Sequence, residues 1–464
     1  MASKSISKSV IWQLAGKFAL QGLALLTTPI FTRILAPNDY GYTALYNSWL
    51  DVFVLFIGLQ TSGTIGTARI KYNFDKGTIY SYLATLLTTS VISFVFFFTI
   101  TYTFKDNFES ITGIDKDFGL ILIIHSFSLY ILSFIVTKFD QFKQVEKSTI
   151  LSAAYSVLSI ICSLCFLFFI SCNKAKLKIL GQFLPVLIIS IIIILFVYMK
   201  GKSIFKKEYF IYCIKLAMPF VLHGLASVVF IHCDKIMLNR LQGDTAVGLY
   251  STAFSLVSVL FIIHSSLNTA WVPFYFDLKK ENDTTEILIH SKRLMKFFLL
   301  ISSGFILMAY DVFKILTPNT YWQAMSLFPF FVLSNYFLFL YLFPSNFEVF
   351  SEKNIFLSVG TSFTALLNII LNYFLIKAYG YIGAAISTLI SNISLFIFHE
   401  IIAFTIGKGK YENKIFFYLY SICILLVFIF IARLFKDLFI VRWIIACMIA
   451  IYLLLDIKKR RSIF

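Results

Sequence analysis

Long apolar runs dominate the pattern of hydrophobic and polar positions along this chain. Positions 422–431 are apolar throughout, and 187–198 are apolar at nearly every position. A helix that crosses a bilayer needs roughly 20 mainly apolar residues, whereas a strand of a membrane barrel alternates polar and apolar positions over about ten residues. Because lipid offers no hydrogen-bond partners, each segment must satisfy its own backbone. The pattern predicts an all-α integral membrane protein.

The apolar runs predict about fourteen membrane-spanning helices. Their approximate limits are 10–35, 41–60, 80–103, 119–138, 149–171, 179–199, 211–234, 245–269, 292–316, 324–342, 355–376, 381–404, 414–433 and 438–456. The first run passes residue 30 without a small-residue cleavage site, so we expect it to be retained as a span. No connecting segment is long enough for a soluble domain with a conventional enzyme active site. Twelve spans is the alternative count.

Two parts of the chain repeat one another. Leu20-Gln21-Gly22-Leu23-Ala24 corresponds to Leu222-His223-Gly224-Leu225-Ala226, and the segment from Asp39 to Tyr46 corresponds to that from Asp244 to Phe254. Six predicted spans separate the copies, so both halves enter the membrane in the same direction, as in parallel transporter repeats. We expect two pseudo-symmetric six-helix bundles, 1–200 and 201–408, followed by 409–464 with two more spans and a basic tail. The substrate route is expected between the bundles.

Composition and charge agree with a membrane protein. The 464 residues are 59% hydrophobic and 14% charged, and their net charge is +17; the mean hydropathy is +0.85. In a soluble protein this charge would suggest nucleic acid, but the Lys and Arg residues lie mostly in short segments between apolar runs. They are about twice as frequent in the segments predicted to be inside, which places both termini in the cytoplasm. Lys174, Lys176 and Lys178 are exceptions, since they lie in a segment predicted to be outside.

Motifs for cofactors, metals or hydrolysis are not found in the sequence. The seven cysteines lie in or next to apolar runs, and the CxxC pair of Cys162 and Cys165 has no second pair or histidine cluster beside it. We interpret them as packing residues. The chain has neither a glycine-rich phosphate loop nor a His-Glu-x-x-His pair. We therefore expect a protein that is not an enzyme, with no metal, no cofactor and no ATP hydrolysis.

Polar stripes mark the opening helices of the two bundles. Gln13, Lys17, Gln21 and Thr28 fall within an arc of about 80° on the first span. On the seventh span Lys215 corresponds to Gln13, and His223 corresponds to Gln21. A charge at the bilayer centre costs about 2.5–3.5 kcal/mol on insertion scales, so such side chains usually face a wet cavity or a partner. We expect Lys17 to point inward.

The second span carries a carboxylate at membrane depth. Thr43, Asn47 and Asp51 share one face, so Asp51 is expected to face the Lys17 stripe. Either the two charges neutralise each other or Asp51 couples transport to an ion; His223 is the other candidate for coupling.

Other polar residues have simpler explanations. Arg33, Asp234, Lys235 and Arg240 lie at predicted outer span ends, where long side chains reach the interface with or without a function. We expect the stripe of Thr361, Thr364, Asn368 and Asn372, and the serines of the next span, to hydrogen-bond between helices.

Three segments resemble a known family. The run Phe31-Thr32-Arg33-Ile34-Leu35-Ala36-Pro37-Asn38-Asp39-Tyr40-Gly41 resembles the start of Wzx-type flippases for O-antigen and other polysaccharides. Asp234-Lys235-Ile236 with Val247-Gly248-Leu249-Tyr250, and Tyr379-Gly380-Tyr381-Ile382-Gly383-Ala384-Ala385, are similar to later parts of the same family. The resemblance covers most of the chain. The wider superfamily also holds multidrug exporters and the peptidoglycan-precursor flippase.

The resemblance implies a fold and a function. Two bundles would enclose a central cationic cavity and alternate between inward and outward openings in the bacterial inner membrane. A lipid-linked oligosaccharide on undecaprenyl pyrophosphate would cross from the cytoplasmic to the periplasmic leaflet, with proton or sodium coupling. Partners would be membrane lipids and the polymerase and chain-length proteins of the pathway, with no nucleic acid. The candidate cavity residues are Lys17, Lys215, Gln13, Gln21, Asn47, His223 and Arg33; Asp51 and His223 are candidates for ion coupling.

Two other functions stay open at this point. A cation-coupled exporter of amphipathic drugs would favour a carboxylate-lined pocket, whereas this chain has more basic than acidic groups at depth. A membrane glycan polymerase or ligase typically has a large external loop, and the predicted outside segments here are short.

Overall fold

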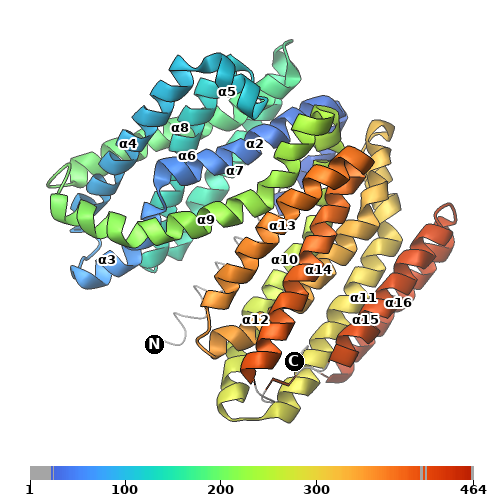
Figure 1. Cartoon of the computed structure of the whole chain (residues 1–464). Coiled ribbons are helices and arrows are strands. Elements are labelled where there is room, and N and C mark those ends of the chain that lie inside the picture. Colours follow the sequence, from blue (N-terminus) through green and yellow to red (C-terminus); the bar gives the residue numbers. More distant parts are fainter. Residues whose placement is uncertain (1–21, 24–25, 408–410, 413–414, 461–464) are drawn as a thin grey trace. The chain divides into compact units, whose positions relative to one another are not determined.

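The computed structural model describes residues 22–23, 26–407, 411–412 and 415–460. All regular elements in these residues are helices (Figure 1). Of the first predicted span, the described part at 26–34 is helical. The candidates Gln13, Lys17 and Gln21 lie outside the described residues. The predicted all-α membrane fold is confirmed for the residues that the structure describes.

Packed helices form two compact units, Met1–Gly248 and Leu249–Phe464. The first contains α2 Pro37–Gly58, η1 Thr61–Thr64, α3 Ile65–Lys71, α4 Tyr80–Thr103, α5 Lys105–Thr112, α6 Lys116–Gln141, α7 Val145–Phe169, α8 Lys174–Lys200 and α9 Lys207–Gln242. The second contains most of α10 Asp244–Lys280, then α11 Thr284–Leu316, η2 Asn319–Leu327, α12 Phe328–Phe350, α13 Ile355–Tyr379, α14 Tyr381–Gly407, α15 Ile415–Leu434 and α16 Phe439–Arg460. The bundle limits predicted at 200 and 408 follow the sequence repeat, which this packing does not test, and they stay a prediction.

Eleven of the described helices are long and apolar enough to cross a membrane. The number becomes thirteen if each of two bent pairs is one span. In the first pair, α2 and Thr61–Lys71 are bent by 49°, because Leu59 and Gln60 adopt left-handed φ angles of 47° and 53°. In the second, α9 bends by 41° shortly after Pro219. The count of fourteen stays a prediction, since it includes the first span.

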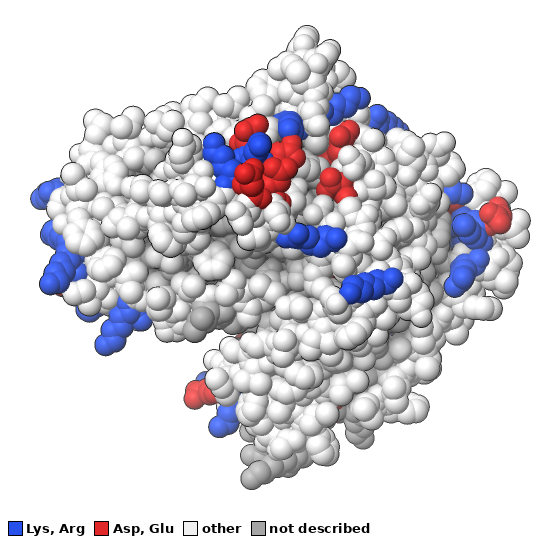
Figure 2. Space-filling model, turned by 45° about the horizontal axis from the view of Figure 1, so that its top comes forward, with Lys and Arg blue, Asp and Glu red and all other residues white. Residues whose placement is uncertain are grey.

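The surface of these helices suits a lipid environment. Large apolar side chains such as Phe169, Met199 and Phe404 are mostly exposed, which in water would be an aggregation hazard. Figure 2 shows charged side chains gathered in separate groups, with mostly uncharged surface between them. The chain is therefore a multi-pass membrane protein.

Two glycines allow α2 and α10 to meet backbone to backbone. A Cβ added to Gly41 would lie 1.8 Å from the carbonyl oxygen of Asp244, and one added to Gly248 would lie 1.9 Å from that of Pro37. Real Cβ atoms do not approach so closely, so only glycine fits at either position. These are the corresponding glycines of the sequence repeat, and each makes room for the segment that carries the other.

The three lysines that are exceptions to the charge distribution have structural partners at the start of α8. The Asn173 side chain accepts a hydrogen bond from the Lys176 backbone N–H at 3.1 Å and so caps the helix. The Lys174 ammonium donates to the Ile34 carbonyl at 3.0 Å, and Lys176 forms an ion pair with Asp115. The buried Lys178 ammonium lies 4.5 Å from the Phe31 ring centre and 3.4 Å from the Thr43 hydroxyl. Local contacts therefore account for this basic triplet, and α7 and α8 are separate helices.

A buried guanidinium in the second unit joins α16 to α11. Arg442 on α16 is fully buried and donates to Asp311 on α11 at 2.8 Å and to the Leu307 carbonyl at 3.0 Å. The Trp443 indole N–H donates to the other Asp311 oxygen at 3.0 Å. Such a pair positions α16 against α11, because breaking it would leave an uncompensated buried charge.

Candidate functional site

A charged group joins two packed helices of the first unit. Asp51 on α2 lies 3.0 Å from His232 Nε2 on α9, and α2 packs against α9. Lys235 follows one turn later on α9 and interacts electrostatically with the carboxylates of Asp51 and Asp234. We call these four residues the α2–α9 cluster.

The α2–α9 cluster lies deep along both helices. Asp51 is about 21 Å from the start of α2, and His232 is about 15 Å from the end of α9, at 1.5 Å per residue. The close approach of Gly41 to Asp244 places those two helix ends together. The Asp51 side chain is 51% exposed while His232 is 11% exposed. A half-exposed carboxylate at this depth needs water or a polar ligand beside it, because lipid cannot solvate it.

The predicted site residues only partly converge on this cluster. Asn47 lies one turn before Asp51 on α2 and is half-buried. Lys215 is exposed on α9, but it is about 25 Å from His232 along that helix. Arg33 is exposed near the start of α2. The side chain of His223, like Lys17, lies outside the described residues, so the proposed pairing of Lys17 with Asp51 stays a prediction.

His232 is the part of the cluster that the sequence did not suggest. Asp234 and Lys235 stand out in the sequence as residues at a predicted span end and as part of a segment that resembles the family. The signal was present, since His232 and Lys235 have the three-residue spacing of one helix face. Nδ1 of His232 has no hydrogen-bond partner in the described structure. The contact with Asp51 therefore uses Nε2 alone.

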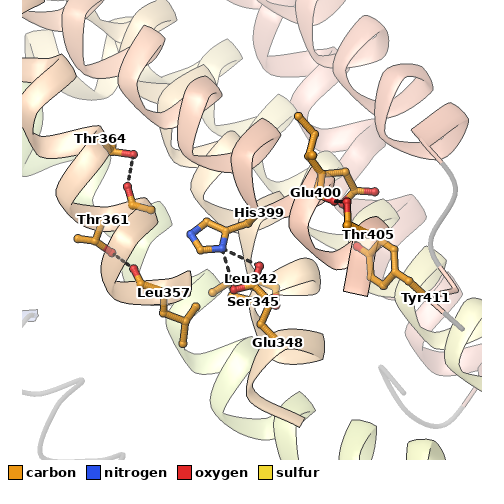
Figure 3. Close-up of polar contacts among 12 residues, drawn as sticks. Leu342, Ser345, Glu348, Leu357, Thr361, Thr364, His399, Glu400, Thr405 and Tyr411 are labelled. Carbon is orange, nitrogen blue, oxygen red and sulfur yellow. Dashed lines mark hydrogen bonds and ion pairs between the residues drawn. The ribbon is translucent and has the colours of Figure 1, made fainter. Parts of the chain in front are cut away.

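A second titratable pair lies inside the other unit (Figure 3). His399 Nδ1 on α14 lies 2.8 Å from Oε1 and 3.0 Å from Oε2 of Glu348 on α12. Both side chains are completely buried. Nε2 of His399 has no hydrogen-bond partner among the described residues, and a Cβ added to Gly360 on α13 would lie 2.3 Å from it. Three helices thus close around the imidazole.

Burial determines the chemistry of this pair. A neutral imidazole beside an ionised carboxylate would leave a net negative charge in an apolar interior, which costs several kcal/mol. Removing either member would leave the other polar group buried without its partner, so the pair joins α12 to α14.

The second unit holds further polar contacts besides this pair. The Tyr341 ring lies 4.8 Å from the imidazole, centre to centre. The Tyr411 hydroxyl donates to Glu400 at 2.9 Å (Figure 3), and Lys279 forms an ion pair with Glu412. In the part of the chain that the structure describes, no group of three His, Cys, Asp or Glu side chains could hold a metal ion.

The polar stripe on α13 makes the predicted hydrogen bond between helices at Asn368, while Thr361 and Thr364 donate to carbonyls of their own helix. Asn368 Nδ2 donates to the Ser387 hydroxyl at 3.3 Å, and that hydroxyl donates to the Asn368 carbonyl at 3.1 Å. The two hydrogen bonds between Asn368 and Ser387 join α13 to α14. Asn372 Nδ2 donates to Asn368 Oδ1 at 3.1 Å within α13.

A sequence profile described as "Polysaccharide biosynthesis protein" matches residues 6–279, which is more than half of the chain. The chain belongs to the polysaccharide biosynthesis protein family. This chain is also similar to "Lsg locus putative protein 1" of Haemophilus influenzae. The two are 21% identical over 312 residues, which cover 64% of this chain and 72% of the relative. The resemblance to Wzx-type flippases is confirmed at the level of the family.

Solved structures share the fold of this polysaccharide biosynthesis protein. It is similar to "Lipid II flippase MurJ, inward closed conformation", with a TM-score of 0.67 and 14% identity over 92% of this chain and 99% of the other. It is also similar to an inward-facing "multidrug resistance MATE family transporter of the MOP superfamily", with a TM-score of 0.62 and 15% identity over 84% and 96%. The predicted relation to multidrug-exporter-like flippases is confirmed for the fold.

Proposed function

We propose that this protein moves an oligosaccharide repeat unit, linked to undecaprenyl pyrophosphate, from the cytoplasmic to the periplasmic leaflet by alternating access. The product would enter O-antigen or another surface polysaccharide. Membership of the polysaccharide biosynthesis family carries the proposal, and the likeness of fold to a lipid II flippase supports it. The protein would lie in the bacterial inner membrane with both termini cytoplasmic, next to the polymerase and chain-length proteins of its pathway.

We assign recognition of the pyrophosphate to Lys17 and Lys215, because a cation at low dielectric attracts a multiply charged oxyanion far more than it does in water. Gln13, Gln21, Asn47, His223 and Arg33 would bind the sugars and the rest of the head group. Replacing both lysines by glutamine is expected to abolish surface-glycan export while the protein still reaches the membrane. Unchanged export, measured by glycan staining and immunoblotting, would remove these lysines from the mechanism.

Ion coupling would use the α2–α9 cluster, with Asp51 as its exposed carboxylate. The substitution Asp51→Asn removes the charge that His232 and Lys235 face, so we expect transport to fall by at least about tenfold, since intramembrane charges are costly to keep without a purpose. Export is measured in a deletion strain complemented with each variant. Asp106→Asn, at an 89% exposed side chain on α5, is the matched control. Equal export by both variants would contradict this role.

Export of amphipathic drugs is the second candidate function. The likeness of fold to a multidrug resistance transporter and the exposed Asp51 favour it. Deletion of the gene separates the two functions. A flippase mutant loses surface glycan and accumulates lipid-linked repeat units at the cytoplasmic face, whereas a drug-exporter mutant keeps its glycan and becomes more sensitive to cationic compounds.

A further inference from the structure

Four cations gather at one end of the first unit. Arg69 lies in the last turn of α3, Lys76 in the α3–α4 loop, Lys138 in the last turn of α6 and Lys147 in the first turn of α7. Lys138 is close enough to Lys76 and Lys147 for electrostatic interaction with both. This end carries segments that the charge distribution predicts to be inside. We call these residues the inner cation group.

Lys138 is unusual because it is a buried cation without a carboxylate. The residue is 3% exposed, and its ammonium donates to the Tyr80 hydroxyl at 3.4 Å. It also lies 5.1, 4.9 and 5.6 Å from the ring centres of Tyr80, Phe139 and Phe142. Among the described residues no carboxylate forms an ion pair with it. Aromatic faces offset only part of the cost of such a charge.

A shallow, open pocket of about 440 Å³ lies next to Phe142, whose ring also faces this lysine. Arg69, Phe74, Asp75, Lys76, Gly77 and Phe142 line it. Arg69 donates to the Gln141 carbonyl, and its guanidinium carbon lies 5.4 Å from the centre of the Phe142 ring. Lys138 lies 5.6 Å from the centre of the same ring. Phe142 therefore lies next to both Arg69 in the pocket lining and the buried Lys138.

The one carboxylate in the pocket lining is engaged by its own loop. Asp75 Oδ1 accepts hydrogen bonds from the Thr78 N–H at 2.7 Å, the Gly77 N–H at 2.8 Å and the Thr78 hydroxyl at 2.9 Å. These hydrogen bonds lower the pKa of the Asp75 carboxyl. Asp140 is likewise engaged, because it accepts from the Ser148 hydroxyl. Neither carboxylate reaches Lys138, so the inner cation group keeps an excess of positive charge.

We propose that this pocket is the loading site for the diphosphate group of the lipid-linked substrate, at the inner membrane surface and before the substrate enters the transport route. The assignment rests on the proposed function. Topology alone explains exposed lysines, but it does not explain a buried one that lacks a counter-ion. A diphosphate ester carries more charge than the phosphodiester of a bilayer phospholipid, so it compensates several cations at once. Arg69 and Lys76 contact the diphosphate directly. Lys138, which lies next to Phe142, attracts it electrostatically without contact.

Binding to the full chain in nanodiscs of phosphatidylcholine tests this site. The probe is undecaprenyl diphosphate, titrated against the wild type, the double variant with Arg69→Gln and Lys76→Gln, and the variant Lys138→Met. Arg69 lies in the last turn of α3 and Lys76 in a loop, so we expect the double variant to fold. We expect the double variant to lose at least about tenfold in affinity and Lys138→Met to lose less. The control Lys105→Gln removes a cation that lies 4.6 Å from the Tyr102 ring, at the other end of α4, and is expected to bind as the wild type does.

Two outcomes would overturn the assignment. Equal affinity of the wild type and the double variant would mean that the cations serve topology only. Equal competition by phosphatidylglycerol would mean that the pocket holds an ordinary bilayer lipid. Failure of the proposed function looks different, because a deletion strain would then keep its surface glycan whatever the binding results. If the double variant supported wild-type export and bound normally, only the loading site would be withdrawn.

Discussion

The substitution Gly248→Ala is expected to prevent stable folding of the first unit. Its Cβ would lie 1.9 Å from the Pro37 carbonyl oxygen and 3.1 Å from the Gly41 nitrogen. Because these are backbone atoms, no side chain can rotate away to make room, and α10 would have to move off the start of α2. Overpacking usually costs about 1–3 kcal/mol, and we expect this substitution to reach or exceed that range. Thermal unfolding in detergent, followed by size-exclusion chromatography, measures the loss.

The chain offers a matched control for this substitution. Gly304 is also within a helix, but a Cβ added to it would meet only Ile449 at 4.0 Å. Gly304→Ala is expected to leave stability unchanged or to raise it by up to about 1 kcal/mol, because alanine is the better helix former. Gly41→Ala should behave as Gly248→Ala does. If Gly248→Ala and Gly304→Ala unfold at the same temperature, the backbone contact between α2 and α10 is wrong.

Replacing Glu348 by alanine is the second change with a large expected effect. His399 would lose its partner at 2.8 Å while completely buried, and the cavity left by the side chain would add to the cost. Removing one partner of a buried charged pair typically costs about 3–5 kcal/mol. We therefore expect Glu348→Ala to yield little folded protein, measured by the same thermal unfolding experiment.

Glu348→Gln separates the hydrogen bond of this pair from the charge of its carboxylate. Glutamine keeps an oxygen that can accept from His399 Nδ1, so we expect a smaller loss of stability than for alanine. Glu352→Gln, at an exposed position in the turn between α12 and α13, is the control. Stability equal to the wild type in Glu348→Ala would contradict the observed pairing.

The sequence was sufficient for the fold class because lipid restricts the choice of structure. Apolar runs of helical length can satisfy their backbone only as helices, and the structure contains them. The repeat also pointed to Gly41 and Gly248 as equivalent positions. It could not reveal why both are glycine, since the reason is a contact between residues about 200 positions apart. Such a contact depends on how the helices cross, which local periodicity does not encode.

The titratable pairs were harder to predict for the same reason. Asp51 stood out as a carboxylate inside an apolar run, but its partner His232 comes from a helix much later in the chain. Glu348 and His399 lie on different helices, 51 positions apart, and only tertiary packing brings them together. A carboxylate in the apolar segment 328–350 was a usable signal for one half of this pair.

Movement of a lipid-linked oligosaccharide between leaflets by the purified protein tests the central claim most directly. The full chain is reconstituted into proteoliposomes that carry a fluorescent undecaprenyl-pyrophosphate oligosaccharide, and an added membrane-impermeant reagent quenches the label in the outer leaflet. We predict that quenching proceeds beyond the outer-leaflet fraction with the wild type, and stops at that fraction with Asp51→Asn and in liposomes without protein. Quenching that stops at the outer-leaflet fraction with the folded wild type, under an imposed proton or sodium gradient of either direction, would contradict the proposed function.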